Sequence, residues 1–492
     1  PKMSLTPSWN FGSVGFGHIA LPPNAPNLSS HKSSSDCGAS GADEESTAGT
    51  EDVGRVSVFD AAKAAAPDPI LSMRDQYNAD PAERKLNLAV GVYRTAEGKP
   101  LVLKCVQEAE TKLLAEQEAG RAFKEYLPPD GHSKFCDLSL KLLLGDAIDG
   151  MLADGRVAAA QSISGTGGLH LAARMLKLLM PDATVHLPAP TWPIHPDIFE
   201  AVGLSVAHYP YYDAETGGLD LDGMLAYLRA LPHGSVVLMH ACAHNPSGVD
   251  PTAVQWAQIA AAVRERWLVP MVDAAYQGLA TGDLDEDGAG ARALAAVPGV
   301  EMITVQSYSK NMGLYAERAG VVALLCADRD VASRVQQQLS RTIRLTHSSP
   351  PQHGAAICAT ILGEPERLQA WKREVKGMAE RLLEMRATLA ASLAKCECPP
   401  PTTSKRGSWA HVTEQRGMFT YTGLTPAQVK ALRETHHVYM PNDGRISMAG
   451  LTTATCGMLA TAIKDVLHAE AKHAFAEPAT ELPAAKRARS AA

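Results

Sequence analysis

Short apolar runs alternate with helical patterns through the middle of this chain. The strand-like runs are residues 157–163, 184–187, 235–240, 269–272 and 302–305. Helical periodicity follows the first run over 169–179, and a further helix is predicted to open at Pro251. This alternation is typical of an α/β fold with a mostly parallel sheet, in which ligands gather at the carboxyl ends of the strands.

The chain is long enough for two globular domains, with 492 residues of which 46% are hydrophobic. A charged helical pattern from Glu364 to Lys395 is ended by three prolines, and a last strand-and-helix segment follows. We therefore expect a large domain over 101–377 and a smaller one made of 57–100 and 378–473.

Both ends of the chain have a different composition. Residues 1–56 are rich in Ser, Gly, Ala and Pro and lack apolar periodicity, so they are predicted to be disordered, as is the tail 474–492. The first segment is serine-rich, like an organelle transit peptide, but it has no arginine before Arg55 and carries an acidic patch. A mitochondrial or plastid location is favoured over the cytoplasm, with a plain extension as the alternative.

Composition also argues against several classes of partner. The net charge is −7 and no basic stripe with interleaved aromatics occurs, which argues against nucleic acid. No apolar run approaches the roughly 20 residues that span a bilayer, so no membrane association is expected. The nine cysteines are scattered, which predicts reduced thiols. Near the histidines we find no partners at ligand spacing, and we expect no metal.

The segment from residue 306 to 318 carries the most specific local signal. An apolar run ends in Ser307 and Ser309, Lys310 follows at once, and Arg318 lies a few residues beyond. A lysine on a rigid strand end can form a Schiff base with an aldehyde cofactor, whose phosphate the hydroxyls and the arginine could hold. Taken alone, a solvated surface lysine is the simpler interpretation.

Polar groups follow other predicted strands as well. The segment 164–167 (SGTG) lies between a strand and a helix, where backbone amides favour an anion, although an ordinary tight turn is the alternative. Asn245 precedes a proline and could aim its amide at a ligand oxygen or cap a turn. Asp273 closes an apolar run, with Tyr276 three residues on. Such a carboxylate needs a positive partner, either a protonated pyridine nitrogen or a structural arginine.

Together, and in this order, these segments resemble the aspartate aminotransferases, pyridoxal-phosphate enzymes of class I and fold type I. The resemblance extends from about Ser57 to His473. Its motifs are SVFD, DPIL, NLAVGVYR, EYLP, SGTG, PTW, HACAHNPSG, DAAYQG, QSYSKNMGLYAER, GMFTYTGL and GRISMAGLT. It implies a large domain with a mostly parallel, seven-stranded-type sheet flanked by helices, plus a smaller α/β domain. The implied reaction is ping-pong transamination of L-aspartate and 2-oxoglutarate to oxaloacetate and L-glutamate.

The resemblance implies a catalytic role for Lys310, Asp273 and Tyr276, and cofactor-binding roles beside them for His195 and Asn245. Lys310 would carry the pyridoxal 5′-phosphate as an aldimine and then shuttle the substrate proton. Asp273, backed by His195, would keep the pyridine nitrogen protonated. Tyr276 and Asn245 would bond the cofactor's phenolic oxygen.

Further residues would bind the cofactor and the substrate. Trp192 would stack on the ring and, with Asn245, contact the substrate. The residues around the phosphate would be Ser164, Gly165, Thr166, Ser307, Ser309 and Arg318, with Tyr126 reaching in from the other subunit. The substrate residues would be Arg445 for the α-carboxylate, Arg344 of the partner subunit for the distal carboxylate, and Gly91, Ile70 and Leu71 on the small-domain side. A site shared in this way requires a homodimer.

Three other interpretations remain open. Ala89, Ser247 and His347 depart from the usual pattern, and His347 lies close after Arg344, so an aromatic or broad-specificity aminotransferase of the same fold is an alternative. The S-x-x-K pattern at 307–310 also occurs in acyl-serine hydrolases, but their S-D-N and K-T-G elements are absent here. A non-catalytic binding protein is the third possibility.

Overall fold

The computed structural model describes residues 57–64, 68–121, 124–401 and 403–476. The chain divides into two compact units, residues 1–65 and 66–492. Of the first unit, residues 57–64 form a turn in which the Asp60 amide donates to the Ser57 carbonyl. All helices and strands named below belong to the second unit. The predicted N-terminal extension lies outside the described residues.

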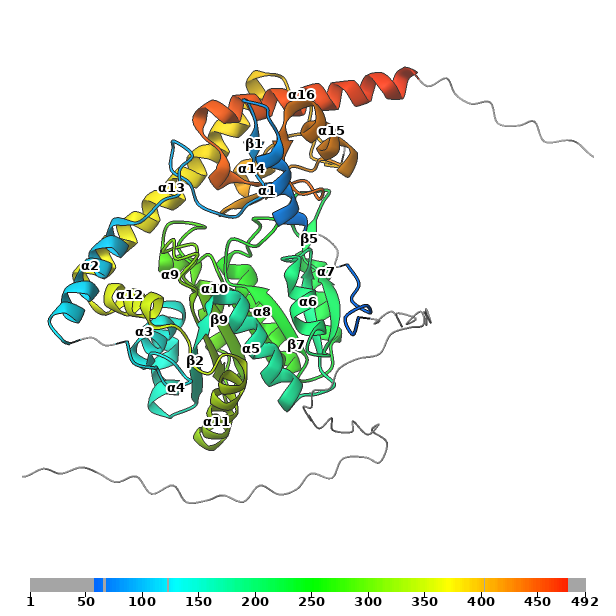
Figure 1. Ribbon diagram of the computed structural model, residues 1–492. Coiled ribbons are helices and arrows are strands. Elements are labelled where there is room, and N and C mark those ends of the chain that lie inside the picture. The colour runs from blue at the N-terminus through cyan, green and yellow to red at the C-terminus, as the bar shows by residue number, and fades with distance from the viewer. Residues whose placement is uncertain (1–56, 65–67, 122–123, 402, 477–492) are drawn as a thin grey trace, which may run out of the picture. The chain divides into compact units, whose positions relative to one another are not determined.

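A seven-stranded sheet forms the centre of the second unit (Figure 1). Its order is β2 (Val157–Ile163), β10 (Ala319–Leu325), β9 (Met302–Ser307), β8 (Val269–Ala274), β7 (Val236–His240), β3 (Thr184–Ala189) and β4 (Ser205–Pro210). β10 runs antiparallel to both of its neighbours, and the other pairs are parallel. The five predicted strands are present, β4 and β10 complete the sheet, and the predicted α/β class is confirmed.

Helices cover both faces of this sheet (Figure 1). One face is covered by α5 (Ser164–Leu179), α6 (Ile194–Glu200) and α11 (Arg329–Thr346), and the other by α3 (Ser133–Leu144), α7 (Leu221–Ala230), α8 (Ala253–Arg266) and α10 (Ala289–Ala295). In β7, Val236 and Leu238 pack into the apolar core under α5, α6 and α11, while Val237 and Met239 pack into the core on the opposite face. Side chains alternate between the faces of a strand, and both faces are buried, so the strand is apolar throughout.

Two helices begin elsewhere than predicted. α8 begins at Ala253 rather than at Pro251, because Thr252 caps it and exchanges hydrogen bonds with Gln255 in a capping box. α5 begins at Ser164, so the glycine-rich segment 164–167 is its first turn and not a separate loop. Glycine has low helix propensity, but a Cβ at Gly168 would lie 2.7 Å from a methyl of Val305. Close packing of the helix on β9 therefore requires glycine there.

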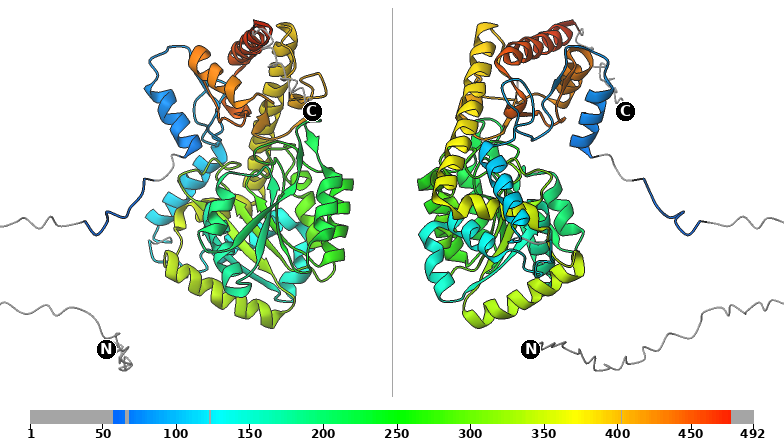
Figure 2. Two further views of the ribbon diagram at one scale, coloured as in Figure 1. Left: turned by 90° about the vertical axis from the view of Figure 1, so that its right-hand side faces the viewer. Right: turned by 60° about the vertical axis from the view of Figure 1, so that its left-hand side comes forward.

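The long charged pattern forms α13 (Pro365–Lys395), as predicted. It packs against α2 (Lys104–Glu118) and α12 (Gln352–Gly363), and also against α16 (Thr453–Ala476) (Figure 2). Near α16 lie α1 (Pro69–Ala79), α15 (Pro426–His436) and two strand pairs, β1 (Leu86–Asn87) with β12 (Val438–Tyr439) and β11 (Phe419–Tyr421) with β13 (Arg445–Ser447). The predicted domain boundary at 377/378 falls inside α13, and the division into two domains stays a prediction.

The remaining elements are short. They are η1 (Gly145–Ile148), α4 (Asp149–Ala153), β5 (Tyr212–Asp213), β6 (Gly218–Leu219), α9 (Leu284–Asp287), α14 (His411–Glu414) and η2 (Met448–Gly450). α16 continues to Ala476, past residue 474 where the tail was predicted to begin; residues 477–492 lie outside the described part. Among the described residues, none of the helices combines the length and apolarity needed to cross a bilayer. The eight cysteines in that part of the chain are free thiols.

Candidate active site

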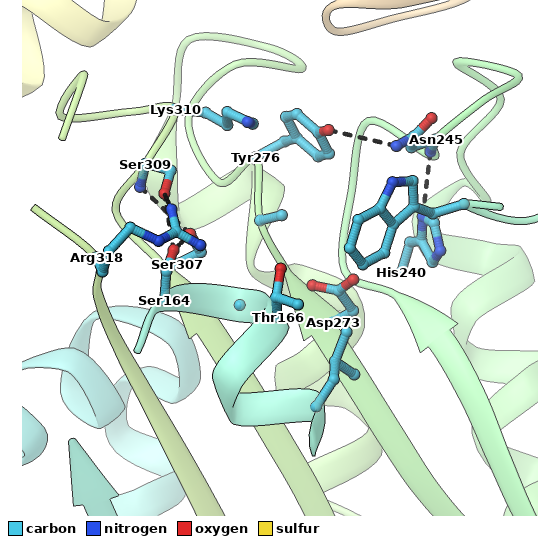
Figure 3. Close-up of a pocket in the computed structure, with 14 residues that line it drawn as sticks. Ser164, Thr166, His240, Asn245, Asp273, Tyr276, Ser307, Ser309, Lys310 and Arg318 are labelled. Carbon is cyan, nitrogen blue, oxygen red and sulfur yellow. Dashed lines mark hydrogen bonds between the residues drawn. The ribbon is translucent and has the colours of Figure 1, made fainter. Parts of the chain in front are cut away.

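A pocket lies at the carboxyl edge of the parallel strands (Figure 3). It is lined by Ser164, Gly165, Thr166, Leu169, Trp192, His240, Asn245, Asp273, Ala275, Tyr276, Ser307, Ser309, Lys310 and Arg318. Parallel strands end at one edge, which gathers the residues after β7, β8 and β9. Arg318 reaches the same edge because it directly precedes β10, which runs the other way. Eleven of these residues were predicted from the sequence, and Leu169, His240 and Ala275 were not.

Three buried serines and one arginine form a corner of the pocket suited to an anion. The Ser164 hydroxyl lies 2.7 Å from the hydroxyls of both Ser307 and Ser309. Nη1 of Arg318 donates to Ser309 Oγ at 3.2 Å and to the Tyr315 carbonyl at 3.0 Å. The N-terminus of α5 opens at Ser164 and adds its free amides and positive potential. The hydroxyls, amides and guanidinium together match the oxygens and charge of a phosphate.

Lys310 lies three residues after the end of β9 and extends toward Tyr276 (Figure 3). Burial, helped by the nearby charges of Arg318 and Arg445 and opposed by Asp273, lowers the pKa of the Lys310 amine to about 8. An amine with this pKa is partly neutral near physiological pH. It can therefore act as a nucleophile or accept a proton, as an ordinary surface lysine cannot.

Asp273 has one oxygen engaged and one open. Its Oδ2 lies 3.2 Å from Nε2 of the fully buried His195, whose Nδ1 lies 2.7 Å from the Thr191 hydroxyl. Its Oδ1 has no hydrogen-bond partner among the described residues. The predicted backing of Asp273 by His195 is thus present, and His195 lies behind the pocket wall rather than in it. A buried carboxylate oxygen without a partner is suited to a cationic donor of a ligand.

His240 lies beside this pair and was not predicted as a site residue. It is the last residue of β7, directly opposite Asp273 in the register of β7 and β8, so the strand-end rule could have found it. Burial lowers its pKa to about 3, so the ring is neutral, and its Nδ1 accepts a hydrogen bond from the main-chain N–H of Asn245. Atoms of His195, His240 and Asp273 lie within 4.8 Å of one another, close enough to offer a metal three ligands, which the sequence did not predict.

The far wall of the pocket pairs an amide with a phenol. Nδ2 of Asn245 donates to the Tyr276 hydroxyl at 3.5 Å (Figure 3). Burial raises the pKa of Tyr276, and the charge of Arg445 opposes this effect. Trp192 stands edge-on to His195, with ring centroids 5.3 Å apart. Trp192 therefore gives this part of the pocket an aromatic side chain, and Asn245 and Tyr276 give it two polar groups that can donate hydrogen bonds.

Arg445 lies next to the pocket without lining it. It is 3% exposed; its Nη1 donates to Asn245 Oδ1 at 3.4 Å and its Nη2 to the Ala89 carbonyl at 2.5 Å. The Phe419 ring lies 4.3 Å from the guanidinium carbon. The guanidinium is thus linked to Tyr276 through Asn245.

Besides His195 and Arg445, five more predicted site residues do not line this pocket. Tyr126 is 86% exposed, and Arg344 is exposed and donates to the Ser348 hydroxyl. Leu71 is 50% exposed and Ile70 half-buried, while Gly91 lies so close to the Phe419 ring that a Cβ would come within 2.7 Å of it. Tyr126 and Arg344 were predicted to act from a partner subunit, and all five assignments stay predictions.

Residues 83–463 match the family of class I and II aminotransferases. The chain belongs to this family. It is 47% identical over 407 residues to a cytoplasmic aspartate aminotransferase of Oryza sativa subsp. japonica, covering 83% of this chain and 97% of that one. It is 46% identical over 411 residues to the chloroplastic aspartate aminotransferase 3 of Arabidopsis thaliana, covering 84% and 89%.

Solved aminotransferase structures share the fold. The aspartate aminotransferase of Saccharomyces cerevisiae cytoplasm is 37% identical, with a TM-score of 0.79 over 84% of this chain and 98% of that one. The aromatic-amino-acid aminotransferase of Burkholderia pseudomallei, a structure with covalently bound pyridoxal phosphate, is 41% identical, with a TM-score of 0.78 over 84% and 100%. The predicted fold type I architecture is confirmed by this likeness.

Proposed function

We propose that this aminotransferase uses pyridoxal 5′-phosphate to convert L-aspartate and 2-oxoglutarate into oxaloacetate and L-glutamate. The observation that carries the proposal is the placement of Lys310. Its amine has a lowered pKa and lines the same pocket as the serine and Arg318 corner and Asp273, whose Oδ1 is unpaired. The similarity to curated relatives named aspartate aminotransferase supports the choice of substrates.

The residues present fit this cofactor. The corner of three hydroxyls, one guanidinium and a helix N-terminus suits a phosphate, and the unpaired Oδ1 of Asp273 suits a protonated ring nitrogen. Asn245 and Tyr276 suit the phenolic oxygen, and Lys310 suits the aldehyde. When bound there, pyridoxal phosphate supplies an aldehyde that condenses with amines and a ring that withdraws electrons from the substrate α-carbon.

The protein's own groups then have separate tasks. Asp273 keeps a positive charge on the ring nitrogen favourable, and His195 and Thr191 fix the carboxylate from behind. The neutral Lys310 amine removes the proton from the α-carbon of the bound amino acid and carries it at Nζ. Its lowered pKa matters because an amine with the usual pKa of 10.5 would be almost fully protonated near pH 7.

Substrate selection is assigned to two arginines. Arg445 binds the α-carboxylate from beside Asn245, and Arg344 of the partner subunit binds the distal carboxylate. The exposure of Arg344 and Tyr126 on this chain is what a role in a second copy's site requires. The proposal therefore includes a homodimer with shared sites. Light scattering on the purified protein tests it: a monomer at micromolar concentration would contradict it.

An aromatic or broad-specificity aminotransferase is the second candidate. Two solved relatives at 40% and 41% identity carry the name aromatic aminotransferase. His347 ends α11 three residues after Arg344, and neither ring nitrogen has a partner among the described residues. A polar ring with one unpaired donor and one unpaired acceptor, close to Arg344, is a place where substrate breadth could differ.

Half-reaction kinetics with aspartate and with phenylalanine distinguish the two candidates. We expect kcat/KM for aspartate to exceed that for phenylalanine by roughly 30-fold or more, since phenylalanine leaves Arg344 unpaired at a cost of about 2–5 kcal/mol. Comparable values would favour the broad-specificity enzyme. A cofactor-saturated protein that reacts with neither would favour a non-catalytic binding protein.

The compartment belongs to the proposal too. The names of the relatives include cytoplasmic, chloroplastic and mitochondrial forms, so membership of the family does not choose among them. We keep the organelle as the expected location because residues 1–56 are serine-rich. Fluorescent fusions with and without these residues test this: identical diffuse cytoplasmic signals would contradict it.

A further inference from the structure

Arg386 is a buried arginine of α13 that lies outside the pocket. It is 1% exposed, and its guanidinium donates to the main-chain carbonyls of Val412, Arg416, Gly417 and Phe419 at 2.5–3.0 Å. A buried charge is costly unless it is hydrogen-bonded, and charge-assisted hydrogen bonds are strong. All four acceptors belong to residues 412–419, which we call the 412–419 segment. Arg386 therefore fixes the path of this segment.

The 412–419 segment packs against the backbone that carries Asn245. The Arg416 amide donates to the Gly248 carbonyl at 2.7 Å. A Cβ at Gly417 would lie 2.3 Å from the Ala243 Cβ, so the two chains approach at a separation that only glycine allows there. Movement of the 412–419 segment would therefore displace Asn245 as well.

The segment ends at Phe419, whose ring contacts three parts of the site. It lies 4.3 Å from the Arg445 guanidinium carbon and meets the Tyr276 ring edge-on at 5.9 Å. On another side it leaves no room for a side chain at Gly91. β11, which begins at Phe419, also pairs with β13, which begins at Arg445. The Phe419 ring thus packs against the Arg445 guanidinium, and the pairing of β11 with β13 fixes the Arg445 backbone.

The Arg445 guanidinium needs this support because its own hydrogen bonds leave it loosely oriented. It has one short bond to the Ala89 carbonyl and one long bond of 3.4 Å to Asn245. Its Nε has no partner among the described residues. Bidentate binding of a carboxylate requires the guanidinium plane to face the ligand, so packing against Phe419 decides how well the plane is aimed.

We propose that Arg386 is a positioning residue for the α-carboxylate site. It holds the 412–419 segment, the segment holds the Phe419 ring, and the ring orients Arg445. The inference rests on the proposed function, which assigns Arg445 to the α-carboxylate. Arg386 touches neither the phosphate corner nor Lys310, so its main effect falls on substrate affinity, with a smaller effect on cofactor affinity through Asn245 and Tyr276.

The test compares Arg386→Met with Arg381→Met in the cofactor-loaded protein. Arg381 lies on the same helix and also donates to main-chain carbonyls, those of Thr95 and Leu451, but not to the 412–419 segment. Affinity for maleate, a dicarboxylate that cannot react, is measured by titration, together with KM and kcat for aspartate. We expect R386M to bind maleate at least tenfold more weakly and to have a KM for aspartate at least tenfold higher. Its kcat and cofactor affinity should stay within about threefold of those of the unmodified protein. R381M is expected to keep maleate affinity within twofold, and R386K to restore part of the loss.

Each other outcome has a definite meaning. A folded R386M that binds maleate normally, or an equal loss in R381M, overturns the positioning role. If R386M does not fold, Phe419→Leu decides, because it removes the ring from Arg445 and keeps the backbone. A loss of at least fivefold is expected, and normal affinity overturns the inference. Arg445→Ala separates the two proposals: if it binds maleate normally, the assignment of Arg445 fails and with it the proposed function.

Discussion

The proposed site has a phosphate corner at one end and a distal-carboxylate position at the other. A single chain supplies more of the first than of the second. One chain supplies most of the corner: Ser164, Ser307, Ser309 and Arg318 already form one hydrogen-bonded network, and only Tyr126 is assigned to a second copy. At the other end, Arg344 is exposed and absent from the pocket wall. The cofactor end is thus preorganised by the strand ends of a single sheet, whereas substrate selection depends on residues that a second copy must bring.

This difference has a physical origin. Residues at the carboxyl ends of neighbouring strands are fixed by the sheet register, so a ligand that binds there needs little rearrangement of the protein. Arg344 stands in the last turn of α11, outside the sheet, where the orientation of its side chain is not set by the core. Substitutions at the two ends should therefore fail in different ways, the first in cofactor binding or chemistry and the second in substrate choice.

Lys310→Ala is the strongest test of the preorganised end. Without its amine no group at the end of β9 can move the substrate proton, so turnover should fall by roughly 10²–10⁴-fold or more. The phosphate corner is untouched, and the variant should still bind pyridoxal phosphate in equilibrium dialysis. Lys376→Ala, at an exposed position of α13, is the control. Near-normal activity of K310A would contradict the catalytic role.

Arg344→Asp tests the end that needs a partner. The substitution replaces attraction by repulsion, so kcat/KM for aspartate should fall by about 2–5 kcal/mol, or ~30- to ~5000-fold, while cationic amino acids gain. Arg341→Asp, one turn earlier on the same helix, should leave this preference unchanged. If discrimination between aspartate and lysine stays as in the unmodified protein, another residue reads the distal carboxylate.

Arg318→Lys tests whether the corner acts as a built phosphate site. Lysine keeps the charge but loses the two-pronged hydrogen bonding, so binding of pyridoxal phosphate should weaken by about 1.5–3 kcal/mol, or ~10- to ~160-fold, with a smaller effect on substrate KM. Arg329→Lys is the matched control, since its hydrogen bonds go to surface carbonyls of Ala153 and Asp154. An unchanged cofactor dissociation constant would mean that the serines and the helix N-terminus suffice.

The pH dependence of stability gives the smallest expected effect. In the apoprotein the Lys310 pKa is lowered to about 8 from 10.5, so between these values the unfolded chain binds more protons than the folded one. Stability must then rise with pH across this window, and the penalty is fully present below pH 8. Lys310→Met removes it and should be more stable at pH 7 by on the order of 1 kcal/mol, after allowance for solvent screening. In thermal unfolding experiments, the difference in stability between K310M and the unmodified protein should disappear by pH 10.5. A difference that stays constant with pH would contradict the lowered pKa.

The sequence predicted the sheet and most of the pocket because both follow from short-range patterns. An apolar run that ends in Ser307 or Asp273 marks a strand end, and the ends of parallel strands meet. The helical first turn at Ser164 was missed because its glycines indicate a loop unless their packing on β9 is known.

Long-range relations were less accessible. Arg386 is one arginine among many on a charged helix, and its four carbonyl partners lie 26–33 residues away, so no local pattern distinguishes it. His240 was missed although it ends a strand, because a lone histidine has many ordinary uses. The roles of Tyr126 and Arg344 depend on a second chain, which neither a sequence pattern nor a single protomer contains.

The most direct test of the account is the visible absorbance spectrum of the purified, cofactor-loaded protein before and after addition of aspartate without an oxo acid. Pyridoxal phosphate joined to Lys310 should give a visible band that aspartate replaces with the band of pyridoxamine phosphate. K310A should lack the lysine-linked band. The absence of any band after addition of pyridoxal phosphate, or a band that no amino acid alters, would contradict the assignment of this pocket as an aminotransferase site.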